Sequence, residues 1–157
     1  MAVVPGASIV HGDFATFYQS ELAGQVRRAT LLVGDCQDAR DLVHDAFLEV
    51  YRRWGQLDVP GAYLNVVVMN RCRDRARRVA RQRSLPAEVP VVDNDSFDDE
   101  RLWSALQQLP FNHRAAIVLR FHHQMTTAEI AVALGSRPGS VGPWIERGLR
   151  QLRKDLA

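Results

Sequence analysis

Cysteine is scarce in this sequence: Cys36 and Cys72 are the only two among 157 residues. Nothing around them has the spacing of a metal-ligand cluster or of a disulfide framework, so we expect two free thiols. Long apolar runs are also missing, and none approaches the roughly 18 residues that a membrane-spanning helix needs. The first residues, MAVVPGASIVHGD, lack the basic start and the apolar stretch of a signal peptide. These absences predict a cytoplasmic protein that has no membrane association.

The sequence also lacks the common catalytic motifs. It has no glycine-rich phosphate loop, no G-x-S-x-G and no H-E-x-x-H. His122 and His123 are adjacent, so on a helix they project about 100° apart and do not easily share one metal ion. Asp41 and Asp45 fall on the polar face of a predicted helix rather than in an evident cleft. We therefore expect no enzymatic activity, no metal site and no cofactor.

Positive charge is missing from one block of the sequence and negative charge is scarce in another, although the net charge is only +2. Residues 84–100 carry six acids and no base, whereas residues 71–83 carry seven arginines and one acid. Residues 1–70 have a net charge of −3 and residues 101–157 one of +5. Two separated basic blocks favour two contacts with a polyanion. Seven arginines exceed what helix capping needs, so the block 71–83 favours phosphate contacts over a merely solvated helix end.

Apolar residues recur at helical spacing through most of the chain, and no segment requires a strand. Helices are predicted over residues 13–33, 37–54 and 61–83, and two more are predicted between residue 99 and residue 124. The segment 37–54 has the clearest period, and its other face carries Asp38, Asp41, His44, Asp45 and Glu49. That face is either a solvated surface or an acidic docking surface for a basic partner.

Residues 84–100, SLPAEVPVVDNDSFDDE, interrupt the helices. Two prolines, an Asp-Asn-Asp cluster and a net charge of −6 predict a flexible acidic linker without regular structure. The expected fold class is therefore all-α, with two small helical domains, residues 8–83 and residues 101–157, joined by this linker.

Residues 126–154 are predicted to form two short helices joined by a tight turn. Thr126, with Glu129 three residues later, has the spacing of a capping box, and Gly135 suits a helix C-terminus. Ser140 is predicted to cap the second helix, whose basic residues are Arg147, Arg150, Arg153 and Lys154. This pattern is typical of a helix-turn-helix, whose second helix can enter the major groove of DNA. A helical hairpin that contacts only protein is the alternative.

Several stretches in this order resemble one known family. The stretches GDCQDARDLVHDAFLEVYRRW and YLNVVVMNRCRDRARR resemble region 2 of sigma-70 family transcription initiation factors. The stretch that runs from ALQQLPFNHRAAIVLRF to RGLRQLRKDL resembles region 4. Two such regions with a short linker are similar to the extracytoplasmic-function (ECF) group, and the resemblance covers residues 13–83 and 101–156.

The resemblance implies a bacterial sigma factor that binds core RNA polymerase, recognises the −10 and −35 promoter elements and promotes DNA opening. It implies contacts with the clamp helices of the largest polymerase subunit, the flap of the second-largest subunit, promoter DNA and, commonly in the family, an anti-sigma factor. By motif position the polymerase contacts are Asp41, Leu42, His44, Asp45 and Phe47. The −10 contacts are Tyr63, Asn70, Arg71, Arg73, Arg75, Arg77 and Arg78. The −35 contacts are Arg137, Ser140, Trp144, Arg147 and Arg150.

The chain departs from the family pattern near the start of the predicted recognition helix. Most members have a Lys or Arg pair there, whereas this chain has Gly142-Pro143-Trp144, with the proline expected in the first helical turn. Fewer donors to base edges remain, so the −35 contact is predicted to depend on phosphate anchoring by Arg137, Arg147 and Arg150. Two alternative functions stay open: a stand-alone helix-turn-helix regulator, and a protein-interaction module that binds through Trp144.

Overall fold

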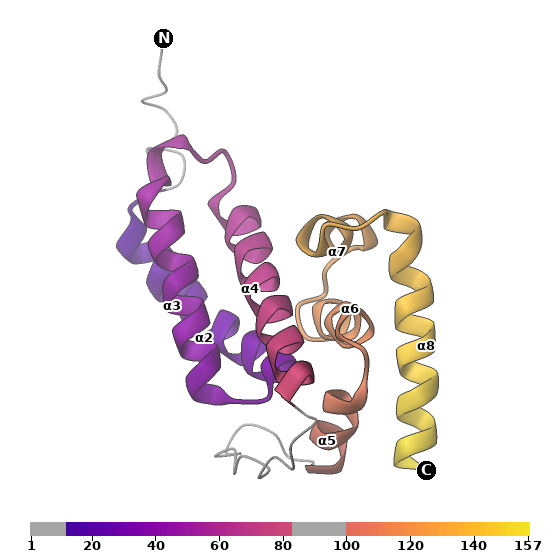
Figure 1. The fold of residues 1–157 in the computed structure, drawn as a ribbon. Coiled ribbons are helices and arrows are strands. Elements are labelled where there is room, and N and C mark those ends of the chain that lie inside the picture. The colour runs from indigo at the N-terminus through magenta and orange to yellow at the C-terminus, as the bar shows by residue number, and fades with distance from the viewer. Residues whose placement is uncertain (1–11, 83–99) are drawn as a thin grey trace.

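The computed structural model of the chain describes residues 12–82 and 100–157 (Figure 1). These residues form seven α-helices and one short 3₁₀ helix, and no strand occurs among them, which confirms the predicted all-α class. In chain order the helices are α2 (Phe14–Val33), α3 (Cys36–Arg52), η1 (Trp54–Gln56), α4 (Pro60–Gln82), α5 (Glu100–Gln108), α6 (Phe111–Phe121), α7 (Thr127–Leu134) and α8 (Pro138–Leu156). The predicted linker over residues 84–100 lies outside the described residues except for Glu100, and so do residues 8–11 of the first predicted domain.

Helices α2, α3 and α4 pack side by side and form the first half of the fold (Figure 1). Asp13 and Asp35 begin α2 and α3 as N-caps, and their carboxylates accept hydrogen bonds from the backbone N–H groups of Thr16 at 2.7 Å and Asp38 at 2.8 Å. Gly34 ends α2 with a φ of 82°, in the left-handed region that favours glycine. The three helices enclose a core that includes the fully buried side chains of Leu32, Val43, Val50, Leu64, Val68 and Met69.

The second half contains α5 to α8, and α7 and α8 form the predicted helix-turn-helix. Thr126 caps α7: its hydroxyl oxygen accepts a hydrogen bond from the backbone N–H of Glu129 at 3.2 Å. Gly135 ends α7 at a φ of 63°. The predicted N-cap and C-cap of this helix are therefore confirmed.

The last helix, α8, begins earlier than the sequence predicts. Pro138 occupies the first helical position and Arg137 is the N-cap, without a side-chain hydrogen bond, so the predicted cap at Ser140 is wrong. Proline suits this position because the N–H that it lacks would have no helical partner there. Pro143 is consequently the sixth residue of the helix rather than part of its first turn. The helix continues to Leu156 although Pro143 cannot donate to the fourth residue before it.

Helices α6 and α8 approach each other closely at Gly148, which is buried. A Cβ atom placed on Gly148 would overlap Cδ1 of Ile117 and would lie 3.5 Å from Cβ of His113. Because glycine has no side chain at this point, the C-terminal half of α8 can lie directly on α6. This contact fixes the orientation of the long helix relative to the rest of the second half.

The two halves pack against each other along a seam, which consists of the contacts of α2 and α4 with α5, α6 and α7. Gln107 Nε2 donates to the carbonyl oxygen of Leu31 at 2.8 Å, and Arg114 Nη1 donates to that of Leu32 at 2.8 Å. Both carbonyls belong to the last turn of α2, where no intrahelical donor remains. The second half thus caps a helix of the first, an arrangement that the sequence did not predict.

Candidate functional site

The outer face of α3 carries most of the predicted docking residues. The exposed or half-buried members of that set are Asp41, Leu42, His44 and Asp45. Two apolar residues further along the helix, Leu48 and Tyr51, are 52% and 61% exposed. They follow His44 at spacings of four and seven residues, which helical geometry places on one face. Negative charge and exposed apolar area therefore share this surface, a combination that favours a protein partner. Sequence reasoning missed Leu48 and Tyr51, although their spacing from His44 was a usable signal.

Phe47 does not lie on that face. It is 2% exposed, and its ring packs 4.8 Å from that of Tyr18 and 6.0 Å from that of Phe17, between ring centroids. The predicted partner contact at Phe47 is therefore corrected to a core position that holds α3 against α2. The reason is the helical period: position 47 falls on the same side of α3 as the buried Val43 and Val50.

Acidic side chains of α3 hold two of the arginines predicted for the −10 contact. Arg71 Nη2 donates to Oε2 of Glu49 at 3.2 Å, and the hydroxyl of Tyr63 donates to Oε1 of the same carboxylate at 2.9 Å. Arg75 Nε donates to Oδ2 of Asp38 at 2.8 Å. Burial and the hydrogen bond to Glu49 raise the pKa of the Tyr63 phenol. The carboxylates thus fix the orientation of these side chains and offset part of their positive charge.

Other residues of the same predicted set are open to solvent. Asn70, Arg77 and Arg78 are exposed on α4, and neither Arg77 nor Arg78 forms an ion pair within residues 12–82 or 100–157. Their charges are therefore the part of the basic block most available to a polyanion.

Arg73 reaches across the seam rather than toward solvent. Its Nη2 donates to the carbonyl oxygen of Leu134, at the end of α7, at 2.7 Å. The guanidinium also lies over the ring of Phe111, 5.7 Å from the centroid. Burial lowers the pKa of Arg73. In this arrangement a residue predicted to contact DNA is engaged with the other half of the molecule.

The predicted −35 residues lie along α8 and at its start. Arg137, Arg147 and Arg150 are exposed, whereas Ser140 and Trp144 are half-buried, and Trp144 packs against the core. Arg150 Nη2 lies 3.0 Å from Oε1 of Glu146, in a pair whose side chains are 70% and 73% exposed. Such an exposed pair contributes only about 0.2–1 kcal/mol, so it leaves Arg150 able to bind another anion.

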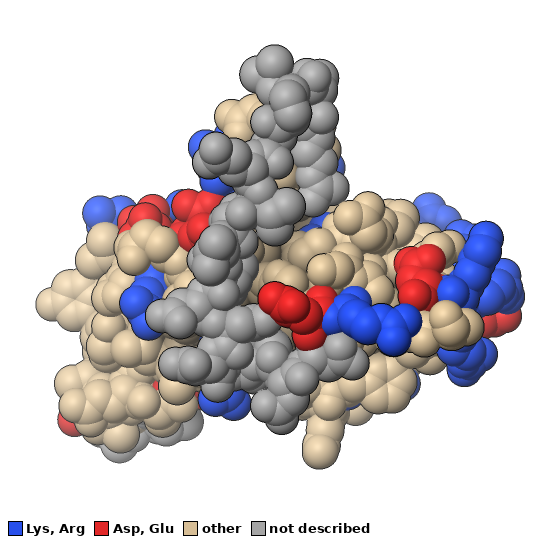
Figure 2. All heavy atoms as spheres, turned by 90° about the horizontal axis from the view of Figure 1, so that it is seen from below, with Lys and Arg blue, Asp and Glu red and all other residues tan. Residues whose placement is uncertain are grey.

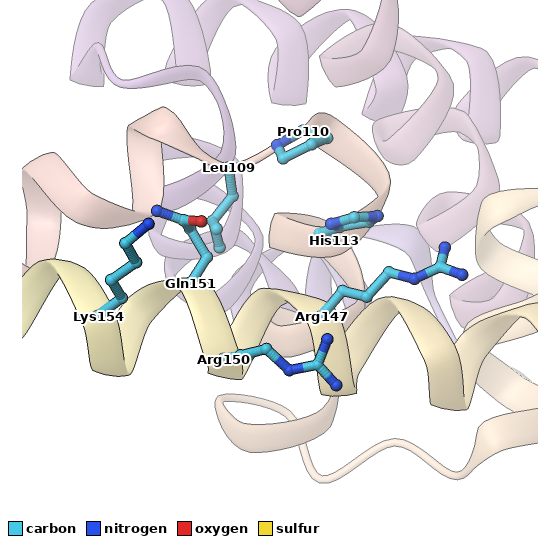
Figure 3. Close-up of a pocket in the computed structure, with 7 residues that line it drawn as sticks. All are labelled: Leu109, Pro110, His113, Arg147, Arg150, Gln151 and Lys154. Carbon is cyan, nitrogen blue, oxygen red and sulfur yellow. The ribbon is translucent and has the colours of Figure 1, made fainter.

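A groove of about 420 Å³ lies between the C-terminal half of α8 and the junction of α5 with α6 (Figure 3). It is lined by Leu109, Pro110, His113, Arg147, Arg150, Gln151 and Lys154. Burial and the nearby charge of Arg147 lower the pKa of His113, which favours its neutral form. Seen from below, basic side chains gather at the edge of the molecule formed by the end of α8 (Figure 2). Sequence reasoning missed His113, Gln151 and Lys154, although positions 147, 151 and 154 have helical spacing.

No helix within the described residues is long and apolar enough to cross a membrane. Within the same residues, no group of three or more His, Cys, Asp and Glu side chains could hold a metal ion. Cys36 and Cys72 are both free, and Cys72 is fully buried.

Comparisons with solved structures agree with this fold. The sigma factor RpoE from Bartonella quintana, in complex with the anti-sigma factor NepR, superposes with a TM-score of 0.69 at 21% identity and covers 90% of this chain and 96% of its own. The protein CnrH, in complex with the cytosolic domain of CnrY, superposes with a TM-score of 0.68 at 22% identity. The match covers 96% of this chain and 93% of the CnrH chain. At these identities the likeness shows the fold alone.

Sequence comparisons show the family. The model of sigma-70 region 2 matches residues 17–82, and that of sigma-70 region 4 matches residues 99–152. The RNA polymerase sigma-E factor of Streptomyces coelicolor is 33% identical over 153 residues, which are 92% of this chain and 86% of the relative. The ECF RNA polymerase sigma factor SigL of Mycobacterium tuberculosis is 31% identical over an alignment of 174 positions, which covers 99% of this chain and 96% of the relative. The chain therefore belongs to the sigma-70 family, as a promoter-recognising RNA polymerase sigma factor of the extracytoplasmic-function group.

Proposed function

We propose that this sigma factor docks on core RNA polymerase through the outer face of α3 and contacts promoter DNA through α4 and α8. The observation that carries the proposal is the separation of these surfaces. The acidic and apolar face of α3 is suited to a protein partner, whereas the exposed arginines of α4 and α8 are suited to DNA phosphates. The family as a whole binds core polymerase and promoter DNA; the assignment of residues is our own.

The polymerase contact consists of Asp41, Leu42, His44 and Asp45, extended by Leu48 and Tyr51. The clamp helices of the largest subunit are the proposed partner, and Leu48 and Tyr51 supply the apolar centre that such interfaces need. Replacing both Asp41 and Asp45 with Arg should weaken core binding at least tenfold, because it reverses charge at the centre of the face. Asp58→Arg is the matched control, since Asp58 is exposed outside α3. Unchanged core affinity in the double variant would refute the docking face.

The −10 contact consists of Tyr63, Asn70 and the arginines of α4. Promoter opening requires no bond chemistry: a base leaves the stack, and protein contacts offset a cost of a few kcal/mol. Stacking on the Tyr63 ring would contribute roughly 1–3 kcal/mol. Glu49 holds this ring through its hydroxyl, and the guanidinium of Arg53 lies over one face, 5.7 Å from the ring centroid. A base would therefore stack on the other face.

The −35 contact lies along α8, from its N-cap Arg137 to Arg150. Arg137, Arg147 and Arg150 anchor phosphates, Ser140 contributes at the start of the helix, and the half-buried Trp144 gives the helix an apolar support rather than a base-reading donor. Removing any one of these arginines should reduce the slope of log affinity against log salt by about 0.9, the value for one lost phosphate contact on duplex DNA. Arg153→Ala, an exposed position near the end of the helix, is the control. An unchanged slope for both Arg137→Ala and Arg147→Ala would contradict phosphate anchoring.

The relatives' complexes suggest a further partner. Sigma factor RpoE was solved with the anti-sigma factor NepR, and CnrH with the cytosolic domain of CnrY. We propose that this chain is likewise held by an anti-sigma factor and, when released, meets the polymerase flap through residues 101–157. Residues 8–83 and 101–157 are the proposed domains, and the cytoplasm is the proposed compartment. Sigma factors are in general non-catalytic regulators, and we propose no catalytic activity for this one. Recovery of a stoichiometric partner that blocks core binding would support the anti-sigma proposal.

A further inference from the structure

The closed arrangement of the two halves cannot contact both promoter elements at once. The −10 and −35 elements are about 25 base pairs apart by their names, which is roughly 85 Å along B-DNA. A compact chain of 157 residues has a radius of gyration of only about 15 Å. On the proposed function, the seam must therefore open before the chain can work. The contacts in the seam decide how readily this happens.

Two histidines follow the end of α6: His123 is half-buried in that seam, facing α2, and His122 is exposed beside it. A Cβ placed on Gly24 of α2 would lie 3.7 Å from Cε1 of His123, so the imidazole packs against the backbone of α2 in ordinary van der Waals contact. Nε2 of His123 is buried and has no hydrogen-bond partner in the part of the chain that the structure describes. The ring of His122 lies 4.5 Å from that of His123, between centroids. Neither arrangement offers a carboxylate that would stabilise an imidazolium.

The charged groups around this pair are mostly positive. Helix α2 presents Arg27 and Arg28, both of which act on the two histidines, and its acidic residue Glu21 acts on Arg28. Arg28 is only 5% exposed and donates to a neutral oxygen, Oδ1 of Asn65 on α4, at 2.6 Å. The seam therefore already holds a buried guanidinium whose close partner carries no charge.

The other neighbouring helices do not change this balance. From α4, Cys72 is a buried thiol whose pKa burial raises to about 12, so it stays neutral. The acid of α7, Glu129, accepts a hydrogen bond from the hydroxyl of Thr126 at 3.1 Å. The cation of α8 that acts on an α6 histidine, Arg147, acts on His113 rather than on this pair. A proton added to the seam would thus meet positive charge and little compensation.

We propose that the seam is an acid-opened latch: protonation of His123 drives the second half of this sigma factor away from the first. In the closed state its half-buried ring packs against α2 and is neutral. In the open state the ring is in water and can take up a proton. A fall in pH therefore favours the state in which Arg73, freed from Leu134, is available to DNA.

The direction follows from linkage. Burial, followed by the charges of Arg28, His122 and Arg27, lowers the pKa of His123 to about 4 in the closed state. In the open state the pKa returns to about 6.5. Above pH 6.5 the ring of His123 is neutral in both states, so its titration does not change the free energy difference between them. Between pH 6.5 and 4 only the open state binds the proton, so closure weakens steadily. For His123 alone, the ratio of open to closed molecules should rise about 20- to 30-fold between pH 7.5 and pH 5.

Single-molecule energy transfer on the full chain tests the latch without polymerase or DNA. Dyes are attached at Arg52→Cys on α3 and Arg153→Cys on α8, both exposed positions, with Cys36→Ser to prevent a third label. Because neither DNA nor polymerase is present, failure of the latch and failure of the promoter-binding proposal can be told apart. Circular dichroism at each pH establishes that the helices remain folded.

We expect the open fraction to grow 20- to 30-fold as the pH falls from 7.5 to 5, with helicity unchanged. The double variant His122→Gln and His123→Gln should lose this dependence, while His113→Gln, on α6 but facing α8, should keep it. His123→Arg, which carries a permanent charge, should be open at pH 7.5. The proposal is overturned if the open fraction stays unmeasurably small at pH 5, if the double variant keeps the full response, or if opening coincides with loss of helix.

Discussion

Nη2 of Arg73 donates to the carbonyl oxygen of Leu134 at 2.7 Å. Arg73, a residue predicted to contact the −10 element, thus caps the last turn of α7, the first helix of the helix-turn-helix. Carbonyls in the last turn of a helix have no donor within the helix and must find one elsewhere. The closed seam holds this guanidinium at the carbonyl of Leu134 and over the ring of Phe111. On the proposed −10 contact, domain closure therefore competes with DNA for the position of Arg73.

Gln107→Ala should weaken the seam. The Gln107 side chain donates to the Leu31 carbonyl and accepts from Arg114 Nη1, both at 2.8 Å. Losing two net hydrogen bonds, one of them to a charged group, should destabilise the closed arrangement by about 1–3 kcal/mol. Hydrogen exchange of the last turn of α2 measures this, as faster exchange in the variant. Gln108→Ala is the control, because Gln108 is exposed on the same helix; equal exchange in both variants would refute the capping role.

Gly148→Ala should destabilise the second half by about 1–3 kcal/mol, the usual cost of forcing a methyl group into a packed contact. The new Cβ would overlap Cδ1 of Ile117. Ile117→Val removes that methyl group, so the double variant should recover part of the loss. By contrast, Gly142→Ala meets open space and should stabilise α8 by up to about 1 kcal/mol through helix propensity. Urea denaturation of the wild-type protein and these four variants measures the changes in stability, and additivity of the Gly148 and Ile117 changes would argue against a direct contact.

Substitution of the exposed α4 arginines should affect DNA affinity more than substitution of the paired ones. Arg77→Ala and Arg78→Ala should each reduce the salt slope of −10 strand binding by about 0.7, the single-strand value for one phosphate. Arg75→Ala should reduce it less, because Asp38 already offsets that charge in the folded protein. Titrations of fluorescent −10 oligonucleotides at several salt concentrations give the slopes. A larger effect at Arg75 than at Arg77 would show that the ion pair with Asp38 opens on binding.

The two thiols should differ in reactivity. Cys72 is 0% exposed, and burial raises its pKa to about 12, so almost no thiolate forms at pH 8. Cys36 is half-buried at the start of α3. A disulfide reagent should therefore modify one thiol per native chain within minutes and the second only after denaturation. Peptide mapping identifies the residue. Rapid modification of both thiols in the native protein would show that the core around Cys72 opens readily.

Prediction from sequence worked where a local physical pattern decides the structure. The period of α3, the cap at Thr126 and the left-handed position of Gly135 follow from residue spacing and backbone preference, and all three are present in the structure. The start of α8 was misplaced because Ser140 and Pro138 are both acceptable at a helix N-terminus. The helix begins at Pro138, whose ring fixes φ near the helical value two residues before Ser140. Phe47 was misassigned because motif position does not distinguish a residue that touches a partner from one that holds the contacting helix in place.

The sequence by itself determined the helices, the caps of α7, the charge blocks and the family, since each depends on residues close together in the chain. Only the tertiary structure decided which of those charges remain available. Arg71 and Arg75 are paired with α3, Arg73 with the end of α7, and only Arg77 and Arg78 of the predicted arginines stay exposed on α4. The seam and the half-buried His123 within it likewise depend on contacts between helices distant in sequence, whose energies no local pattern records.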